Sequence, residues 1–122
     1  MRTMKLGFTA MLLITVSGLF AQTVQEGKRL LFMHRYQSAK TTLEKVVAAA
    51  PTNAEAIYWL AQSQFELKDI NGAKETLRKG MEGSNGSNPL LLVAMGQAEL
   101  VEKKTSDARQ RFETAISLTK GK

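Results

Sequence analysis

Small and large apolar residues recur along this chain in one helical pattern, which appears three times. Ala39, Ala73 and Ala108 are separated by 34 and 35 positions, and a large apolar residue follows each of them four positions later. Residues at i, i+4 and i+7 share one face of a helix. The three sets are Ala39, Leu43 and Val46; Ala73, Leu77 and Gly80; and Ala108, Phe112 and Ala115. The pattern predicts three amphipathic helices with small residues where a neighbouring helix approaches closely.

A second amphipathic stretch precedes each of these helices and is separated from it by a short polar segment. Residues 66–69 and 102–105 are such segments, so each unit is predicted to be a helix, a tight turn and a helix. Thr52 and Glu55 have the spacing of a capping box, and Asn88 followed by Pro89 is typical of a helix start. These signals divide the chain into repeats of about 22–53, 54–88 and 89–122.

The repeating unit resembles the tetratricopeptide repeat, a helix pair of about 34 residues. The second repeat is most similar to the family pattern, with Ile57, Leu60 and Ala61 in its first helix, followed by Ala73 and Leu77 in its second. The resemblance implies an all-α, short right-handed α-solenoid of about three antiparallel helix pairs. The residues expected to pack the repeats together are Ala39, Leu43, Leu60, Ala61, Ala73, Leu77, Gly80, Gly96, Ala108, Phe112 and Ala115.

The first helix of each repeat departs from the family pattern in its second half. Where the family usually has an aromatic residue, this chain has Leu30, Gln64 and Glu99, and the next position is apolar each time. The rotation of these first helices is therefore left open. A run of Gly, Ser and Asn over residues 83–88 predicts a flexible joint between the second and third repeats.

The N-terminal 21 residues have the pattern of a secretory signal peptide. Arg2 and Lys5 precede an uncharged, mostly apolar run over residues 6–20, and Ala21 comes before the expected mature start at Gln22. A run of about 15 residues is shorter than the ~20 that a membrane-spanning helix needs. We therefore expect export, to the periplasm or outside the cell. The alternative is an uncleaved anchor, which would keep the chain at a membrane surface.

Composition gives little support for catalysis, metal binding or nucleic-acid binding. The chain has no Cys and a single His, His34, which falls at a helix end or turn. Glu99 and Glu102 share a helix face, but no second pair or facing histidine completes a metal site. The basic residues that give the formal charge of +6 are spread in small groups, as is typical of solvated helix faces. We predict no enzymatic activity, no cofactor, no metal and no nucleic-acid partner.

The resemblance implies that the first helices line a concave, protein-binding groove. Two rows of residues would face it: Tyr58, Gln62 and Phe65 in the second repeat, and Val93, Gln97 and Leu100 in the third. The apolar members of each row would contact hydrophobic side chains of a bound peptide or helix, and the glutamines would hydrogen-bond its backbone. With the other helix rotation, several of these residues are core, and Trp59 is expected to fill space between helices.

Two functions follow from these observations. The first is an exported adaptor or scaffold that binds a protein or peptide of unknown identity in the groove. The second is an N-terminal stacking segment of a larger or self-associating array, because the last predicted helix leaves Ile116 and Leu118 without a following repeat to cover them.

Overall fold

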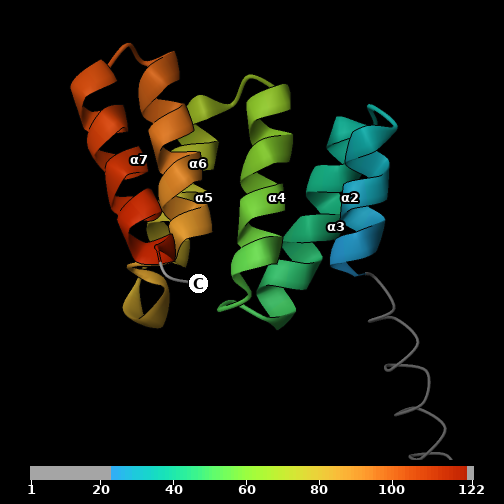
Figure 1. Ribbon diagram of the computed structural model, residues 1–122. Coiled ribbons are helices and arrows are strands. Elements are labelled where there is room, and N and C mark those ends of the chain that lie inside the picture. Colours follow the sequence, from blue (N-terminus) through green and yellow to red (C-terminus); the bar gives the residue numbers. More distant parts are fainter. Residues whose placement is uncertain (1–22, 121–122) are drawn as a thin grey trace, which may run out of the picture.

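The computed structural model describes residues 23–120, and within this range the chain is entirely helical, with no strand. The elements are α2 (Val24–Phe32), α3 (Tyr36–Ala49), α4 (Ala54–Glu66), α5 (Ile70–Gly80), the 3₁₀ turn η1 (Gly83–Asn85), α6 (Pro89–Val101) and α7 (Thr105–Thr119). The helices form three pairs that stack side by side, with α2 and α3 at one end and α6 and α7 at the other (Figure 1). We call α2, α4 and α6 the A helices and α3, α5 and α7 the B helices. The predicted all-α helical solenoid is confirmed.

Asparagine and aspartate side chains begin three of these helices. Asn53 caps α4 by accepting a hydrogen bond from the backbone N–H of Ala56 at 3.1 Å, and Asp69 caps α5 in the same way. Asn88 caps α6 directly before Pro89, as the sequence predicts. The prediction that Thr52 caps α4 is wrong. Asn53 lies one position closer to the helix, and its short amide reaches the free N–H groups of the first turn.

The turn inside each repeat has the same geometry in all three copies. His34, Lys68 and Lys103 have φ values of 60°, 64° and 63°, in the left-handed region. The backbone N–H groups of each of these residues and of the one after it donate back to carbonyls of the preceding A helix, at 2.8–3.0 Å. This is a Schellman motif, which satisfies the last carbonyls of the helix and reverses the chain within a few residues.

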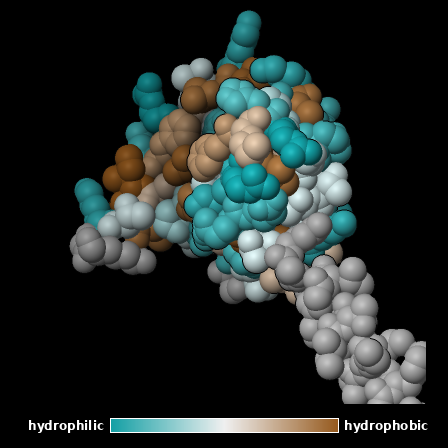
Figure 2. All heavy atoms as spheres, turned by 90° about the vertical axis from the view of Figure 1, so that its right-hand side faces the viewer, coloured by the Kyte–Doolittle hydropathy of each residue, from teal (hydrophilic) through white to brown (hydrophobic). Residues whose placement is uncertain are grey.

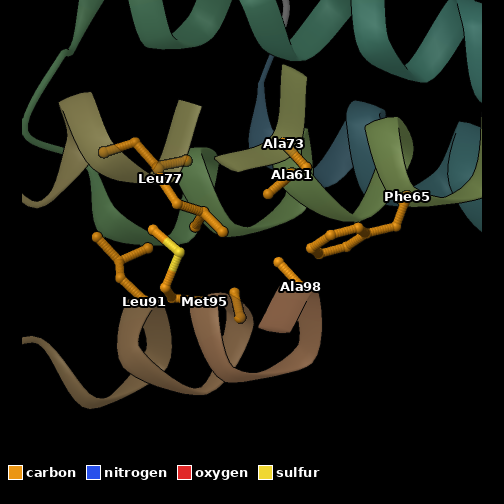
Figure 3. Packing of buried hydrophobic residues seen from close by; sticks show 9 residues of the cluster. Ala61, Phe65, Ala73, Leu77, Leu91, Met95 and Ala98 are labelled. Atoms are coloured by element: carbon orange, nitrogen blue, oxygen red, sulfur yellow. The ribbon is translucent and has the colours of Figure 1, made fainter. Parts of the chain in front are cut away.

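The predicted repeat-packing residues lie in the interior, and all of them are buried except Phe112, which is partly exposed. Contacts between the two helices of a pair are close: a Cβ atom on Gly27 would lie 2.5 Å from Leu43, and one on Gly96 would lie 2.5 Å from Phe112. Between repeats, α4, α5 and α6 share one cluster that includes Phe65, shown in Figure 3. Because Gly27 and Gly96 have no side chain, the paired helices can pack this close together.

The segment between the second and third repeats is short and partly ordered by hydrogen bonds. Gly83, the first residue of η1, has a φ of 66°. Asn85 donates its side-chain N–H to the carbonyl of Thr52 at 3.0 Å, which ties this joint to the preceding inter-repeat turn. Residues 83–88, which the sequence predicts to be flexible, are therefore tied to the preceding inter-repeat turn through Asn85.

The signal-peptide prediction concerns residues 1–21, which lie outside the described residues, so it stays a prediction. None of the helices from α2 to α7 is both long and apolar enough to cross a bilayer.

Candidate protein-binding face

The A helices carry most of the exposed large apolar side chains of residues 23–120, namely Phe32, Leu90, Val93, Leu100 and Val101. We call this surface the A-helix face, and it includes the six residues predicted to line a groove. Tyr58 is partly buried against the core cluster, and Phe65 is only 7% exposed and belongs to that cluster. Val93 and Leu100, at the equivalent positions of α6, are 40% and 47% exposed. The two rows are therefore not equivalent, because α6 packs against α4, whereas no further A helix packs against α6 within residues 23–120.

The two predicted glutamines bond to each other across the repeat boundary. Gln62 donates to Gln97 at 2.9 Å, and Gln97 donates back at 3.3 Å, so the two side-chain amides form a reciprocal pair. Both are partly buried. The pair links α4 to α6 and uses one donor and one acceptor of each amide, which leaves one N–H and one acceptor lone pair on each for another molecule.

An aromatic cluster lies between α2 and α4, at the other end of the A-helix face. Trp59 meets Phe32 edge to face at a ring separation of 5.9 Å and Tyr58 at 5.0 Å. The Lys28 ammonium lies 5.2 Å from the Trp59 ring and 3.5 Å from the Glu55 carboxylate. Trp59 therefore fills space between two helices, as expected, while Phe32 remains 67% exposed.

Phe32 and Val101 are candidate contact residues that were not predicted from the sequence. They occupy equivalent positions at the ends of α2 and α6, and they are 67% and 55% exposed. Val101 directly follows Leu100, one of the six residues predicted to line the groove. The available signal was their separation of two repeat lengths, which places both on the same side of the stack.

A second candidate surface is a polar cleft of about 860 Å³ between α5, α6 and α7. Most of its charged side chains have partners within the described residues: Arg111 donates to Glu99 at 2.9 Å, and Arg78 pairs with Glu75. At its margin Lys74 bonds Glu102 at 2.9 Å, and this bond, with help from Lys104, lowers the pKa of the Glu102 carboxyl. Of these pairs, Lys74–Glu102 joins the second repeat to the third, whereas Arg111–Glu99 joins α6 to α7 and Arg78–Glu75 lies within α5.

Glu99, Glu102 and His34, the residues considered for metal binding or catalysis, make other contacts in the structure. Glu99 is buried against Arg111, and Glu102 is held by two lysines, so the two carboxylates do not converge on one point. No group of three or more His, Cys, Asp or Glu side chains in the described part of the chain is arranged to hold a metal ion. His34 lies exposed in the first turn, with its Nδ1 2.8 Å from the Tyr36 hydroxyl.

Stacked helix pairs of this length and turn geometry define the class: a tetratricopeptide-like helical repeat protein, a fold of interaction modules that are typically non-catalytic. Within that class, a family model matches residues 33–115, more than half of the chain, and the chain belongs to this family, which is described as anaphase-promoting complex, cyclosome, subunit 3. No curated protein matches the chain.

Solved structures agree on the fold. The first TPR domain of human RPAP3 superposes with a TM-score of 0.73 at 20% identity, covering 81% of this chain and 77% of that one. MamA 41-end from Desulfovibrio magneticus RS-1 gives 0.67 at 24% identity, covering 77% of this chain and 52% of that one. A MamA RS-1 double mutant gives 0.66 at 24% identity with the same coverage. This chain thus spans about half the length of the MamA chains, and identities this low establish the fold alone.

Proposed function

We propose that this chain is an exported adaptor that binds a peptide or helix of a partner protein along its A-helix face. The observation that carries the proposal is the row of exposed apolar side chains on that face, with Phe32 at one end and Val93, Leu100 and Val101 at the other. Monomeric proteins rarely leave such side chains gathered on one face without a partner. A catalytic role has no support in the side chains of this face, so we assign none.

The arrangement of the face indicates what kind of segment fits it. Aromatic side chains at α2 and α4 can take one apolar anchor, and the aliphatic side chains of α6 can take a second. Between them, the free N–H and acceptor sites of Gln62 and Gln97 can bond a backbone. An amphipathic helix or an extended strand with two apolar anchors around a polar middle has the matching chemistry.

The test is capture of partners from an envelope extract with the purified chain as bait, followed by direct titration of each partner found. A variant carrying Phe32→Ser and Val101→Ser removes one anchor site from each end, and we expect its affinity for a groove partner to fall at least about tenfold. Both side chains are exposed, so circular dichroism should show unchanged helicity.

The matched control is Leu118→Ser, which removes an exposed apolar side chain from α7, away from the A helices. This variant should bind like the parent chain. Equal binding by all three proteins would contradict the proposal, because the partner would then use another surface. Export is tested separately by mass spectrometry of the chain from its own host: cleavage after Ala21 supports it, and an intact N-terminus in the cytosol contradicts it.

A second candidate function is a structural one, as a stacking segment of a larger or self-associating assembly. The observation that favours it is the exposed apolar end of the stack at α6 and α7, where Ile116 is 59% exposed. Surfaces at the same positions of the other two repeats are covered by the next helix pair.

A further inference from the structure

The open end of the stack carries residues whose counterparts are covered in the inner repeats. Ile116 occupies the position of Val47 and Met81, both of which pack against the core cluster. Leu100 occupies the position of Phe65, which is 7% exposed beside Ala98 of α6 (Figure 3). At the open end Ile116 is 59% and Leu100 is 47% exposed, and a hollow of about 500 Å³ lies beside Val93 and Ile116. We call this surface of α6 and α7 the end face.

The opposite end of the stack is polar. The α6 residues that pack on the preceding repeat include Ala94, Met95 and Ala98, and the equivalent α2 residues are Gln25, Glu26 and Arg29. Glu26 and Arg29 form an ion pair at 2.7 Å. Figure 2, which looks onto the α2 and α3 end, shows a mostly hydrophilic surface there. Head-to-tail stacking of copies would bury this ion pair against the apolar end face, which is unfavourable.

The charges of the end face are complementary to themselves. Arg109 and Glu113 of α7 occupy the positions of Lys74 and Arg78, which point from α5 toward the following repeat and line the polar cleft there. Both are exposed, and neither takes part in an ion pair with any residue between 23 and 120. Two opposite charges four positions apart on one helix match an antiparallel copy of that helix, because each charge then meets the other.

The apolar residues follow the same symmetry. Gly96 of α6 faces Phe112 of α7, Val93 lies beside Ile116, and Leu100 lies toward the start of α7. A two-fold axis midway between Arg109 and Glu113 would bring Ile116 of one copy to the level of Ser106 of the other, near the start of α7 and the end of α6 that carries Leu100. Such an axis would pair Arg109 with Glu113 twice and would place each Ile116 near the Leu100 end of the other copy's α6.

From these observations we infer that a second copy of this chain covers the end face, through a two-fold contact centred on α7. The inference does not require a partner on the A-helix face, although the two surfaces share Val93 and Leu100. It gives the exposed end of the array a specific occupant, and the closed symmetry of the pair stops further growth.

The first test is the mass of the purified chain by sedimentation velocity over a range of concentrations, with its N-terminus established by mass spectrometry. We expect a reversible monomer–dimer equilibrium, and Ile116→Glu should raise the dimer dissociation constant about tenfold or more. Phe32→Glu is the matched control: it places the same charge on an exposed apolar site far from α7 and should leave the constant unchanged.

The second test uses the charges. Arg109→Glu and Glu113→Arg should each weaken the dimer, because each places like charges opposite one another, and the double exchange should restore it. A chain that remains monomeric to its solubility limit, one that grows beyond a dimer, or one whose dimer ignores Ile116→Glu or the charge exchanges would overturn the inference. None of these outcomes bears on the Phe32→Ser and Val101→Ser variant, so this proposal and the adaptor proposal can fail separately.

Discussion

Three residues with side chains hold a backbone conformation that glycine adopts more easily. His34, Lys68 and Lys103 each provide the left-handed residue that ends an A helix. The left-handed region costs an L-residue about 1–2 kcal/mol relative to the right-handed one. The chain tolerates this cost three times because two backbone hydrogen bonds per turn and the packing of the helix pair fix the geometry.

Replacing one of these residues by glycine should therefore stabilise the fold. For Lys103→Gly we expect a gain of up to ~1 kcal/mol, because relief of the left-handed strain exceeds the ~0.4–1 kcal/mol that glycine adds to the entropy of the unfolded chain. Urea denaturation measures the change. The control is Lys45→Gly, at an exposed site within α3, which should cost about 1 kcal/mol. A loss of stability at both positions would mean that the turn is not strained.

At the scale of the elements, the pairing of helices depends on positions without a side chain. Leu43 is fully buried, and its Cγ would lie 2.5 Å from a Cβ atom on Gly27. Because Leu43 has no free space into which to move, an added methyl group must push α2 away from α3. Overpacking of this kind costs about 1–3 kcal/mol.

We therefore predict that Gly27→Ala destabilises the chain, although alanine is the better helix former by about 1 kcal/mol. Thermal unfolding should show a lower midpoint for Gly27→Ala, and adding Leu43→Ala should cost less in this background than in the parent chain. Gln25→Ala, on the exposed side of the same helix, should stay within about 0.5 kcal/mol of the parent. A neutral Gly27→Ala would show that the two helices separate without cost.

The sequence was sufficient for the helices and their packing, since the alanine period and its apolar frame reflect contacts inside each repeat. The exact start of a helix was harder to predict from the sequence. Thr52 and Asn53 are both good N-cap residues, and only the local backbone selects Asn53. The A-helix face was harder still. Phe65 and Leu100 occupy the same position in the repeat, but the next helix covers one and not the other. A repeat pattern predicts a position, whereas exposure depends on which neighbour is present.

At the scale of the whole molecule, stability is shared unevenly along the stack. The main core cluster draws its residues from α4, α5 and α6, whereas α7 packs mainly against α6. In a helical repeat protein each unit is stabilised by its nearest neighbours, so an end unit with one neighbour opens more easily than a middle one. The apolar end face makes this difference larger for α7 than a polar cap would.

Amide hydrogen exchange should therefore be slowest in α4 and α6 and clearly faster in α7.

Leu91→Ala, in the fully buried centre of the cluster, should cost about 2–5 kcal/mol of stability and speed exchange in all helices, because it removes a contact between repeats. Ala115→Gly should speed exchange mainly in α7, since it weakens that helix by about 1 kcal/mol without touching the cluster. Repeating the exchange at higher protein concentration adds a further comparison: if copies pair through the end face, α7 should gain more protection than any other helix. Exchange that is uniform over the helices would instead mean that the stack unfolds as one unit, and that burial at its two ends is as effective as in its middle.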